Sequence, residues 1–374
     1  MRILITGANG FIGENLRLHL SERRDIIAVP FTRKNRNSEL HSLLCDVDFV
    51  IHLAGVNRPK DPNDFVMGNI DFTRDLCDAI TTSGKKIPVI YTSSIQAIQD
   101  NLYGISKRKA EDLIFQLQYV SNNSVYIFRL PNVFGKWCKP NYNSVVATFC
   151  HNIAHDLPIK INDPTAILQL AYIDDVINQI MQIVDGASSV LVANGFNVLH
   201  SQYETTVGEL AQQILSFKNS RINLITERVG VGLVRALYST YLSYLPKEKF
   251  SYQIPVFQDQ RGVFSEIIKT KDSGQFSFFT AGPGVTRGNH YHHTKSEKFL
   301  VVKGAARFAF CNILTNETHD LTVSDQEYRV IESIPGWAHN ITNIGDEEMV
   351  VLLWANEIFE AITPDTHHSH LNLK

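Results

Sequence analysis

The chain has 374 residues, of which 44% are hydrophobic and 20% charged, and its 35 Lys and Arg against 38 Asp and Glu give a formal net charge of −3. This length exceeds one ordinary domain core, so we expect two domains. The near-neutral charge gives no electrostatic case for binding nucleic acid or an anionic membrane surface, and no apolar run is long enough to span a bilayer.

The first half of the chain alternates short apolar runs with polar, helix-like stretches. The runs are RILITG, DIIAVPF, DFVIHLAG, VIYTSS and SVYIFRL. This alternation predicts a parallel sheet with helices on both faces. In the helix after the fourth run, Ala110, Leu113, Ile114 and Leu117 follow helical spacing, so one face is expected to pack against the sheet. From about residue 140 to 240 helices predominate, and an added substrate lobe is expected there.

The character of the sequence changes near residue 245. Residues 250–374 give short alternating runs separated by Gly, Pro, Asn and Asp turns, with almost no helical periodicity. This pattern predicts a compact antiparallel barrel or sandwich. We therefore expect an N-terminal domain at residues 1–245 and an all-β domain at residues 246–374.

A glycine-rich turn follows the first predicted strand. Gly7, Gly10 and Gly13 in ITGANGFIG, with Phe11 and Ile12 among them, lie where the first strand passes into the first helix. Glycine lets the backbone turn tightly and approach a pyrophosphate beside the helix N-terminus. The motif alone fits a plain strand-to-helix turn equally well. Its position after a strand at the start of the chain favours a dinucleotide site made by these five residues.

The second strand ends in FTRKN, where an NAD-binding chain carries an acidic residue for the ribose hydroxyl. Arg33 and Lys34 stand there instead. Two cations favour a 2′-phosphate and therefore NADPH, the alternative being that they are solvated loop charges.

The stretch YTSSIQA is followed by YGISK at the start of a helix. Tyr103 and Lys107 lie four residues apart and face the same way, so the ammonium is expected to lower the pKa of the phenol. Such a phenol can pass a proton to a carbonyl oxygen as hydride reaches its carbon. Ser94, or else Ser93, is expected to donate a hydrogen bond to the same oxygen. With the glycine turn, this set predicts a reductase site.

These motifs, in this order, resemble the extended short-chain dehydrogenase/reductases, which modify nucleotide-linked sugars. The resemblance covers about residues 1–240 and extends to HLAG, GNIDFTRDL, FRLPNVFG and AYIDDV. It implies a Rossmann-type, doubly wound parallel sheet. The implied contacts are Leu53, Ala54 and Asn69 to the cofactor, together with Lys107, and Arg129 and Asn132, together with Ser94, to the sugar nucleotide.

Two local features depart from that family. In this family the segment after the second strand usually contains a third strand with an acidic residue that contacts the adenine. The segment between Pro30 and Asp48 is shorter than usual, so that strand and that contact are in doubt here. Dehydratases of the family carry an acidic pair after the serine or threonine, but this chain has Ile95 and Gln96. Dehydration is therefore disfavoured, which leaves carbonyl reduction or an oxidise-and-return epimerisation.

The stretch GNHYHHTKSEKFLVVKG gathers histidines and a glutamate in the C-terminal domain. Alternate residues of a strand share a face, so His290 and His292 point the same way. Glu297 supplies a carboxylate after a turn, and His339 follows a Pro-Gly turn in PGWAHNITN. Three imidazoles and one carboxylate suit Zn²⁺, with iron, manganese or nickel also compatible.

The spacing of these ligands between two glycines resembles the first motif of the cupins, and the resemblance covers about residues 250–360. Pro335 directly before Gly336 departs from the second motif. The stretch DQRGVFSE is similar to the opening of cupin epimerases that act on deoxyhexulose nucleotides. The resemblance implies a cupin barrel whose metal acts in epimerisation, although a metal can also simply stabilise such a barrel. Epimerisation also needs a base that removes a hydrogen from a sugar carbon. His293 and Lys298 lie near the ligands but on the opposite face, so the sequence does not identify that base.

A keto sugar gives both domains a common substrate. A carbonyl at C4 acidifies the hydrogen on C3, a cation stabilises the enolate, and the same carbonyl can accept hydride from NADPH. The runs NVFGKWCKPNYNSVVATFC and LYSTYLSYLP, with the order of the two domains, make the whole chain similar to the bifunctional capsular-polysaccharide enzymes of UDP-N-acetyl-L-fucosamine biosynthesis. That resemblance implies a homodimeric zinc enzyme that 3-epimerises and 4-reduces a UDP-linked 4-keto-6-deoxy amino sugar to the UDP-2-acetamido-2,6-dideoxy-L-talose form, for capsule or O-antigen.

Two alternatives stay open. One is a reductase whose cupin only binds substrate or closes a dimer, and the other is a non-catalytic sugar-nucleotide sensor. The five cysteines lack the spacing of a disulfide framework or a CxxC site, so we expect reduced, mostly buried thiols in a cytoplasmic protein.

Overall fold

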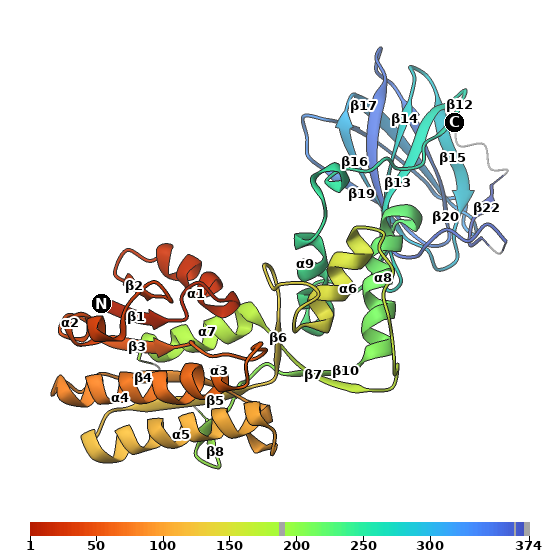
Figure 1. The fold of residues 1–374 in the computed structure, drawn as a ribbon. Coiled ribbons are helices and arrows are strands. Elements are labelled where there is room, and N and C mark those ends of the chain that lie inside the picture. Colours follow the sequence, from red (N-terminus) through yellow and green to blue (C-terminus); the bar gives the residue numbers. More distant parts are fainter. Residues whose placement is uncertain (187–190, 363, 370–374) are drawn as a thin grey trace. The chain divides into compact units, whose positions relative to one another are not determined.

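The structure is a computed structural model that describes residues 1–186, 191–362 and 364–369 (Figure 1). The chain divides into two compact units. The N-terminal unit comprises Met1–Ile214 and Ala236–Leu245, and the C-terminal unit comprises Leu215–Arg235 and Pro246–Lys374. Within the described residues, no helix combines the length and the apolar character that crossing a membrane requires.

The N-terminal unit contains a seven-stranded sheet in the order β2-β1-β3-β4-β5-β9-β8. Its strands are β1 (Arg2–Thr6), β2 (Ile27–Phe31), β3 (Phe49–His52), β4 (Val89–Ser94), β5 (Val125–Leu130), β8 (Val192–Ala193) and β9 (Phe196–Asn197). The first five pair in parallel, which confirms the predicted parallel sheet. β3 pairs directly with β1, and the short segment after β2 forms the helices η1 (Asn37–Glu39) and α2 (Leu40–Leu44).

Helices cover both faces of this sheet (Figure 1). One face carries α1 (Phe11–Ser21) and α7 (Ile173–Val184), which contact each other. The other carries α2, α4 (Phe72–Thr82) and α5 (Leu102–Ser121), preceded by α3 (Asn63–Phe65), η2 (Val66–Asp71) and η3 (Ile95–Ile98). Ala110, Ile114 and Leu117 of α5 are buried in the core as their spacing predicts. The doubly wound α/β fold is therefore confirmed.

A second, three-stranded sheet in the order β10-β7-β6 lies outside the main sheet. Its strands are β6 (Asn132–Phe134), β7 (Ile167–Tyr172) and β10 (Tyr203–Thr206). The helices of this region are α6 (Val145–Ala154), α8 (Val207–Asn223), α9 (Gly232–Ser243) and η4 (Lys247–Lys249). In sequence, α8 and α9 each run across a boundary between the two units.

The C-terminal unit consists of two mostly antiparallel sheets. One has the order β11-β13-β14-β21-β16-β19, with β12 paired to β13, and the other has the order β18-β17-β20-β15-β22. The strands of the first are β11 (Ile225–Thr226), β12 (Phe257–Asp259), β13 (Gly262–Thr270), β14 (Gly274–Ala281), β16 (Glu297–Lys303), β19 (Val330–Ser333) and β21 (Met349–Ala355). Those of the second are β15 (Thr286–Tyr291), β17 (Ala305–Asn312), β18 (Thr318–Ser324), β20 (Trp337–Asn343) and β22 (His367–His368).

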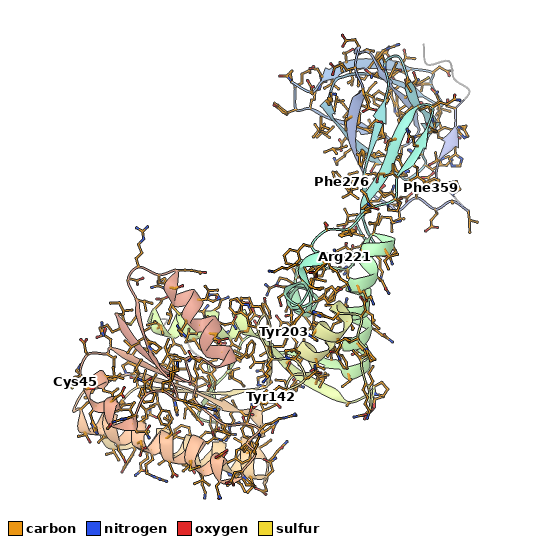
Figure 2. The ribbon with its side chains drawn as sticks, turned by 45° about the horizontal axis from the view of Figure 1, so that its top comes forward. Cys45, Tyr142, Tyr203, Arg221, Phe276 and Phe359 are labelled. Carbon is orange, nitrogen blue, oxygen red and sulfur yellow. The ribbon has the colours of Figure 1, made fainter. Side chains whose placement is uncertain are left out.

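The core of this unit is apolar and aromatic, with Phe299, Phe308 and Val351 among its buried members. Every second residue of β21 is buried, as expected for a strand with one face on the core. The predicted cupin-like β domain is thus confirmed. No disulfide joins the five cysteines, and Cys45, labelled in Figure 2, is the exposed one among them.

Gly274 and Gly284 offer a matched test of packing in the C-terminal unit. Gly274 has φ of +73°, and a Cβ there would lie 1.8 Å from the carbonyl oxygen of Ala355, whereas Gly284 has φ of +74° and nothing within 4 Å of that position. Both Gly→Ala variants incur about 1–2 kcal/mol of left-handed strain. Gly274→Ala should lose roughly 1–3 kcal/mol more because of the overlap. Urea unfolding followed by tryptophan fluorescence, with Trp137 of the N-terminal unit replaced by Phe, measures the difference; equal midpoints would contradict it.

Candidate active sites

The glycine turn between β1 and α1 lies against the segment that follows β3. Gly7 has φ of +68°, and a Cβ on it would lie 2.7 Å from the nitrogen of Ala54 and 2.9 Å from the carbonyl carbon of Leu53. A Cβ on Gly13 would lie 2.4 Å from the carbonyl oxygen of Gly7. Gly10 is the N-cap of α1, and no side chain caps this helix. The structure therefore brings these five residues together beside a helix N-terminus that can receive a phosphate.

The cations expected to recognise a 2′-phosphate follow β2. Arg33 and Lys34 are both exposed, and Phe11 and Ile12 at the start of α1 are half-buried. Since β1 and β2 are parallel, the glycine turn and the two cations lie at the same edge of the sheet, where dinucleotides bind in this architecture.

Asn69 connects the segment after β3 to helix α5. Its side chain is buried, its Oδ1 accepts the N–H of Val56 at 2.6 Å, and its Nδ2 donates to the Val56 carbonyl at 3.0 Å and to the Ser106 hydroxyl at 2.8 Å. A Cβ on Gly55 would lie 3.3 Å from Asn69 Oδ1 and 3.8 Å from Lys107 Nζ. Asn69 thus shapes the wall of the expected cofactor site, because its polar atoms hold the chain that forms it.

The three residues expected to carry the reduction meet at the end of β4 and the start of α5. Tyr103 and Ser94 share a hydrogen bond. Lys107 is buried, its Nζ donates to the carbonyl of Thr92 at 2.8 Å, and it lies 4.4 Å from the centre of the Tyr91 ring. A phenol and a serine hydroxyl therefore face each other, with a buried amine one helical turn along α5, and such a phenol can donate a proton to a carbonyl oxygen.

Burial sets the pKa values of this group. It raises the pKa of Tyr103, and the hydrogen bond with Ser94 offsets this only in part, so the net direction is opposite to the one expected from the spacing of Tyr103 and Lys107. Burial lowers the pKa of Lys107 to about 7, while the charge of Glu111 raises it partly back. Of the two candidate serines, Ser94 contacts the phenol, whereas Ser93 donates its hydroxyl to Glu111.

Glu111, which sequence reasoning missed, is buried one helical turn beyond the lysine. Its two oxygens accept Nε and Nη2 of Arg129 at 3.0 and 2.7 Å, and the guanidinium lies 3.8 Å from the centre of the Phe196 ring. Arg129, expected to face the sugar nucleotide, is thus held by a carboxylate of its own unit. Asn132 is exposed and donates to the carbonyl of Gln169 at 3.3 Å. The only available sequence signal for Glu111 was its position four residues after the lysine.

A second group of polar residues lies in the C-terminal unit. His290 belongs to β15, His292 directly follows it, Glu297 opens β16 and His339 lies on β20. One ligand atom from each of these side chains lies within 4.8 Å of the others. Glu297 Oε2 is 3.2 Å from Nε2 of both His292 and His339. The four residues expected from the sequence to bind a metal are therefore brought together.

A β-bulge and a turn shape this cluster. The register between β15 and β20 shifts between Gly288 and His290, which aims the following side chains. A Cβ on Gly288 would lie 2.8 Å from the carbonyl oxygen of His339, so glycine allows the two strands to approach. The N–H of Gly336 donates to the carbonyl of His292 at 2.8 Å. The Pro-Gly turn before β20 thus also holds the backbone of His292, the candidate metal ligand that follows β15.

The electrostatics of the cluster fit a divalent cation. Burial, with the neighbouring His339, lowers the pKa of His290 to about 3, so this imidazole is neutral at pH 7. Burial alone would raise the pKa of Glu297, but hydrogen bonds with His292 and His339 and the charge of Lys295 hold it well below its usual value. Nδ1 of His339 is buried and has no hydrogen-bond partner among the described residues. Neutral imidazoles with an ionised carboxylate form a donor set that zinc prefers.

The neighbours of the cluster are arranged as strand alternation predicts. His293 and Lys298 are exposed, and Lys298 forms an ion pair with Glu332. Lys295 was not expected to take part, yet it is buried with its Nζ 3.4 Å from Glu297 Oε1. It lies in the turn between the strands, where period-two alternation does not apply.

The fold and these two sites define a nucleotide-dependent oxidoreductase domain joined to a cupin-like domain with a metal-type ligand cluster. Two family models match the chain: the NAD dependent epimerase/dehydratase family over residues 3–198 and the polysaccharide biosynthesis C-terminal domain over residues 257–367. The chain belongs to the NAD dependent epimerase/dehydratase family and carries the polysaccharide biosynthesis C-terminal domain in addition.

Relatives extend over the whole chain. UDP-2-acetamido-2,6-beta-L-arabino-hexul-4-ose reductase of Pseudomonas aeruginosa is 55% identical over 367 residues, which is 98% of both chains. The crystal structure of the capsular polysaccharide assembling protein CapF from Staphylococcus aureus is 42% identical, with a TM-score of 0.90 over 99% of this chain and 100% of that one. A UDP-glucuronic acid 4-epimerase from Bacillus cereus is 18% identical with a TM-score of 0.55 over 65% of this chain and 99% of its own, and it shares the fold alone.

Glu111→Gln should destabilise the N-terminal unit by roughly 2–3 kcal/mol. Loss of a partner in a buried ion pair costs about 3–5 kcal/mol, and Arg129 keeps some contact with water, which reduces the loss. Asp71→Asn breaks the half-exposed pair with Arg74 and should cost about 0–1 kcal/mol. Hydrogen exchange of β4 and β5 amides measures both losses. Equal losses for the two variants would mean that Glu111 does not anchor this unit.

Proposed function

We propose that this chain is a bifunctional sugar-nucleotide enzyme, with metal-assisted C3 epimerisation in residues 246–374 and NADPH-dependent C4 reduction in residues 1–245. Its substrate is UDP-2-acetamido-2,6-dideoxy-β-L-arabino-hexos-4-ulose and its product the UDP-2-acetamido-2,6-dideoxy-L-talose form, on the route to UDP-N-acetyl-L-fucosamine. The observation that carries the proposal is the 55% identity, over 98% of both chains, to a reductase named for this type of ketosugar.

The Tyr103 group suits the reduction step. The glycine turn would hold NADPH, whose hydride would go to C4, and the exposed cations Arg33 and Lys34 support a preference for its 2′-phosphate. The raised pKa of Tyr103 keeps the phenol protonated at neutral pH, which is the form needed to give the C4 oxygen its proton. Ser94 orients that phenol through their hydrogen bond. Hydride on carbon and a proton on oxygen together convert the ketone to an alcohol.

The histidine and glutamate cluster suits the epimerisation step. His290, His292, Glu297 and His339 would hold a divalent cation, with Zn²⁺ favoured by the donor set. Such a cation, when bound, polarises a carbonyl at C4 and so acidifies the hydrogen on C3. The chain prepares its ligands by burial, which keeps His290 neutral, while its hydrogen bonds keep Glu297 ionised.

Tyr103→Phe should reduce NADPH oxidation with the 4-keto UDP-sugar by about 10²–10⁴-fold, since phenylalanine keeps the ring beside Phe65 but has no proton to donate. Uptake of solvent deuterium at C3, followed by NMR, should continue, because the metal-type cluster belongs to the other unit. Tyr119→Phe is the matched control, being on the same helix and 93% exposed. Wild-type reduction by the Tyr103 variant would refute the assigned role.

His290→Ala should abolish deuterium uptake at C3 and remove the bound metal, whose content is measured by mass spectrometry of the purified protein. His293→Ala, which changes an exposed histidine three residues along, should leave both properties unchanged. If exchange at C3 persists in the His290 variant, the C-terminal unit only binds substrate or joins subunits, and the chain is a reductase alone.

A further inference from the structure

The last described residues run beside the strand that bears part of the ligand cluster. β22 pairs antiparallel with β15, and His368 lies opposite His290. Ser369 continues the ladder by donating its N–H to the carbonyl of Asn289 at 2.9 Å. β15 therefore has β20 on one side and β22 on the other. We call residues 365–369 the C-terminal strap.

Asp365 joins the C-terminal strap by hydrogen bonds to residues 292–295, which lie between β15 and β16. Its carboxylate accepts the backbone N–H groups of His293, Thr294 and Lys295 at 2.9, 2.8 and 2.9 Å, and the Thr294 hydroxyl at 3.0 Å. Its backbone carbonyl accepts a hydrogen bond from Nδ1 of His292. Burial would raise the pKa of Asp365, but the backbone hydrogen bonds hold it well below its usual value, so these bonds are made by a charged group.

The carbonyl contact fixes the state of the His292 ring. A carbonyl oxygen can only accept, so Nδ1 carries the hydrogen, and in a neutral imidazole the lone pair then lies on Nε2. That Nε2 is 3.2 Å from Glu297 Oε2. Both ring nitrogens therefore face acceptors. Without a cation, Nε2 also carries a hydrogen and donates it to Glu297; with a cation at the site, the neutral ring offers that cation the lone pair of Nε2. The Asp365 carbonyl thus selects the tautomer that binds a metal.

The loop that Asp365 binds borders open volume on one side. A cavity of about 470 Å³ borders it, lined by Thr294, Lys295, Phe359 and Asp365 among others; Phe359 is labelled in Figure 2. Hydrogen bonds are among the contacts that restrain the loop on this side. Four of those reach the single carboxylate of Asp365, so loss of this group should loosen the turn between His292 and Glu297.

We propose that the C-terminal strap is part of the metal centre and that Asp365 is a positioning residue, which orients His292 through its carbonyl and fixes the turn to Glu297 through its carboxylate. The inference rests on the proposed metal site. It assigns to Asp365 no contact with substrate. Its consequence is that metal affinity depends on a residue distant in sequence from all four ligands.

The test is zinc affinity of the full-length protein, measured by competition with a chromophoric chelator. Asp365→Ala should weaken binding about 10–100-fold, as typical for loss of a group that orients a ligand. Asp365→Asn, which retains the size and one acceptor oxygen, should lose less. The matched control is Asp325→Ala, because the Asp325 carboxylate also accepts a backbone N–H, that of Gly304 at 2.9 Å, in the same unit. Its affinity should stay within about twofold of wild type.

The absorption spectrum of the cobalt-substituted protein gives a second readout, since it reports ligand geometry directly. It should change in Asp365→Ala and not in Asp325→Ala. A wild-type chain that binds no zinc refutes the metal site itself. Wild-type affinity and spectrum in the Asp365 variants refute the strap while leaving the metal site standing. An equal loss in Asp325→Ala refutes positioning in favour of general destabilisation. If Asp365→Ala does not fold, the test uses Asp365→Asn instead. Zinc affinity and a cobalt spectrum equal to those of the wild type in that variant overturn the proposal.

Discussion

Burial of ionisable side chains is the constraint on which both candidate sites depend. A charge removed from water is costly unless a partner stabilises it or the group becomes neutral. Lys107 becomes partly neutral, since burial lowers its pKa to about 7. Glu297 stays charged because His292 and His339 bond to it, and Glu111 stays charged because it pairs with Arg129. Each site is therefore a set of coupled groups, in which the charge of one member depends on the presence of the next.

Glycine places these coupled groups where two backbone segments come together. At Gly7 the turn after β1 lies within contact of the segment after β3, and at Gly288 a bulged β15 approaches the backbone of β20. A side chain at either position would push apart the segments that bear the site residues. The two sites share this device although one belongs to a parallel sheet and the other to an antiparallel pair.

The sequence predicts what is encoded over short spans. The glycine turn and the strand alternation around His290 depend on neighbours within about a turn or a strand, and the structure brings these residues together. Tyr103 and Lys107 lie one turn apart on α5, as their spacing predicts. The confirmed fold class follows from the same periodicities. The raised pKa of Tyr103 and the partner of Arg129 could not be predicted, because burial and long-range pairing decide them. The contact of Asp365 with His292 spans 73 residues and leaves no local pattern.

The opposite pKa shifts of Tyr103 and His290 are compatible with both proposed reactions at one pH. A phenol that donates a proton must be protonated, and burial raises the pKa of Tyr103. An imidazole that binds a cation must be neutral, and burial lowers the pKa of His290 to about 3. The same physical cause, desolvation of the charged form, therefore moves an acid and a base in opposite directions. Near neutral pH, Tyr103 therefore stays protonated and His290 stays neutral. Lys107, with a pKa of about 7, changes its charge in this range.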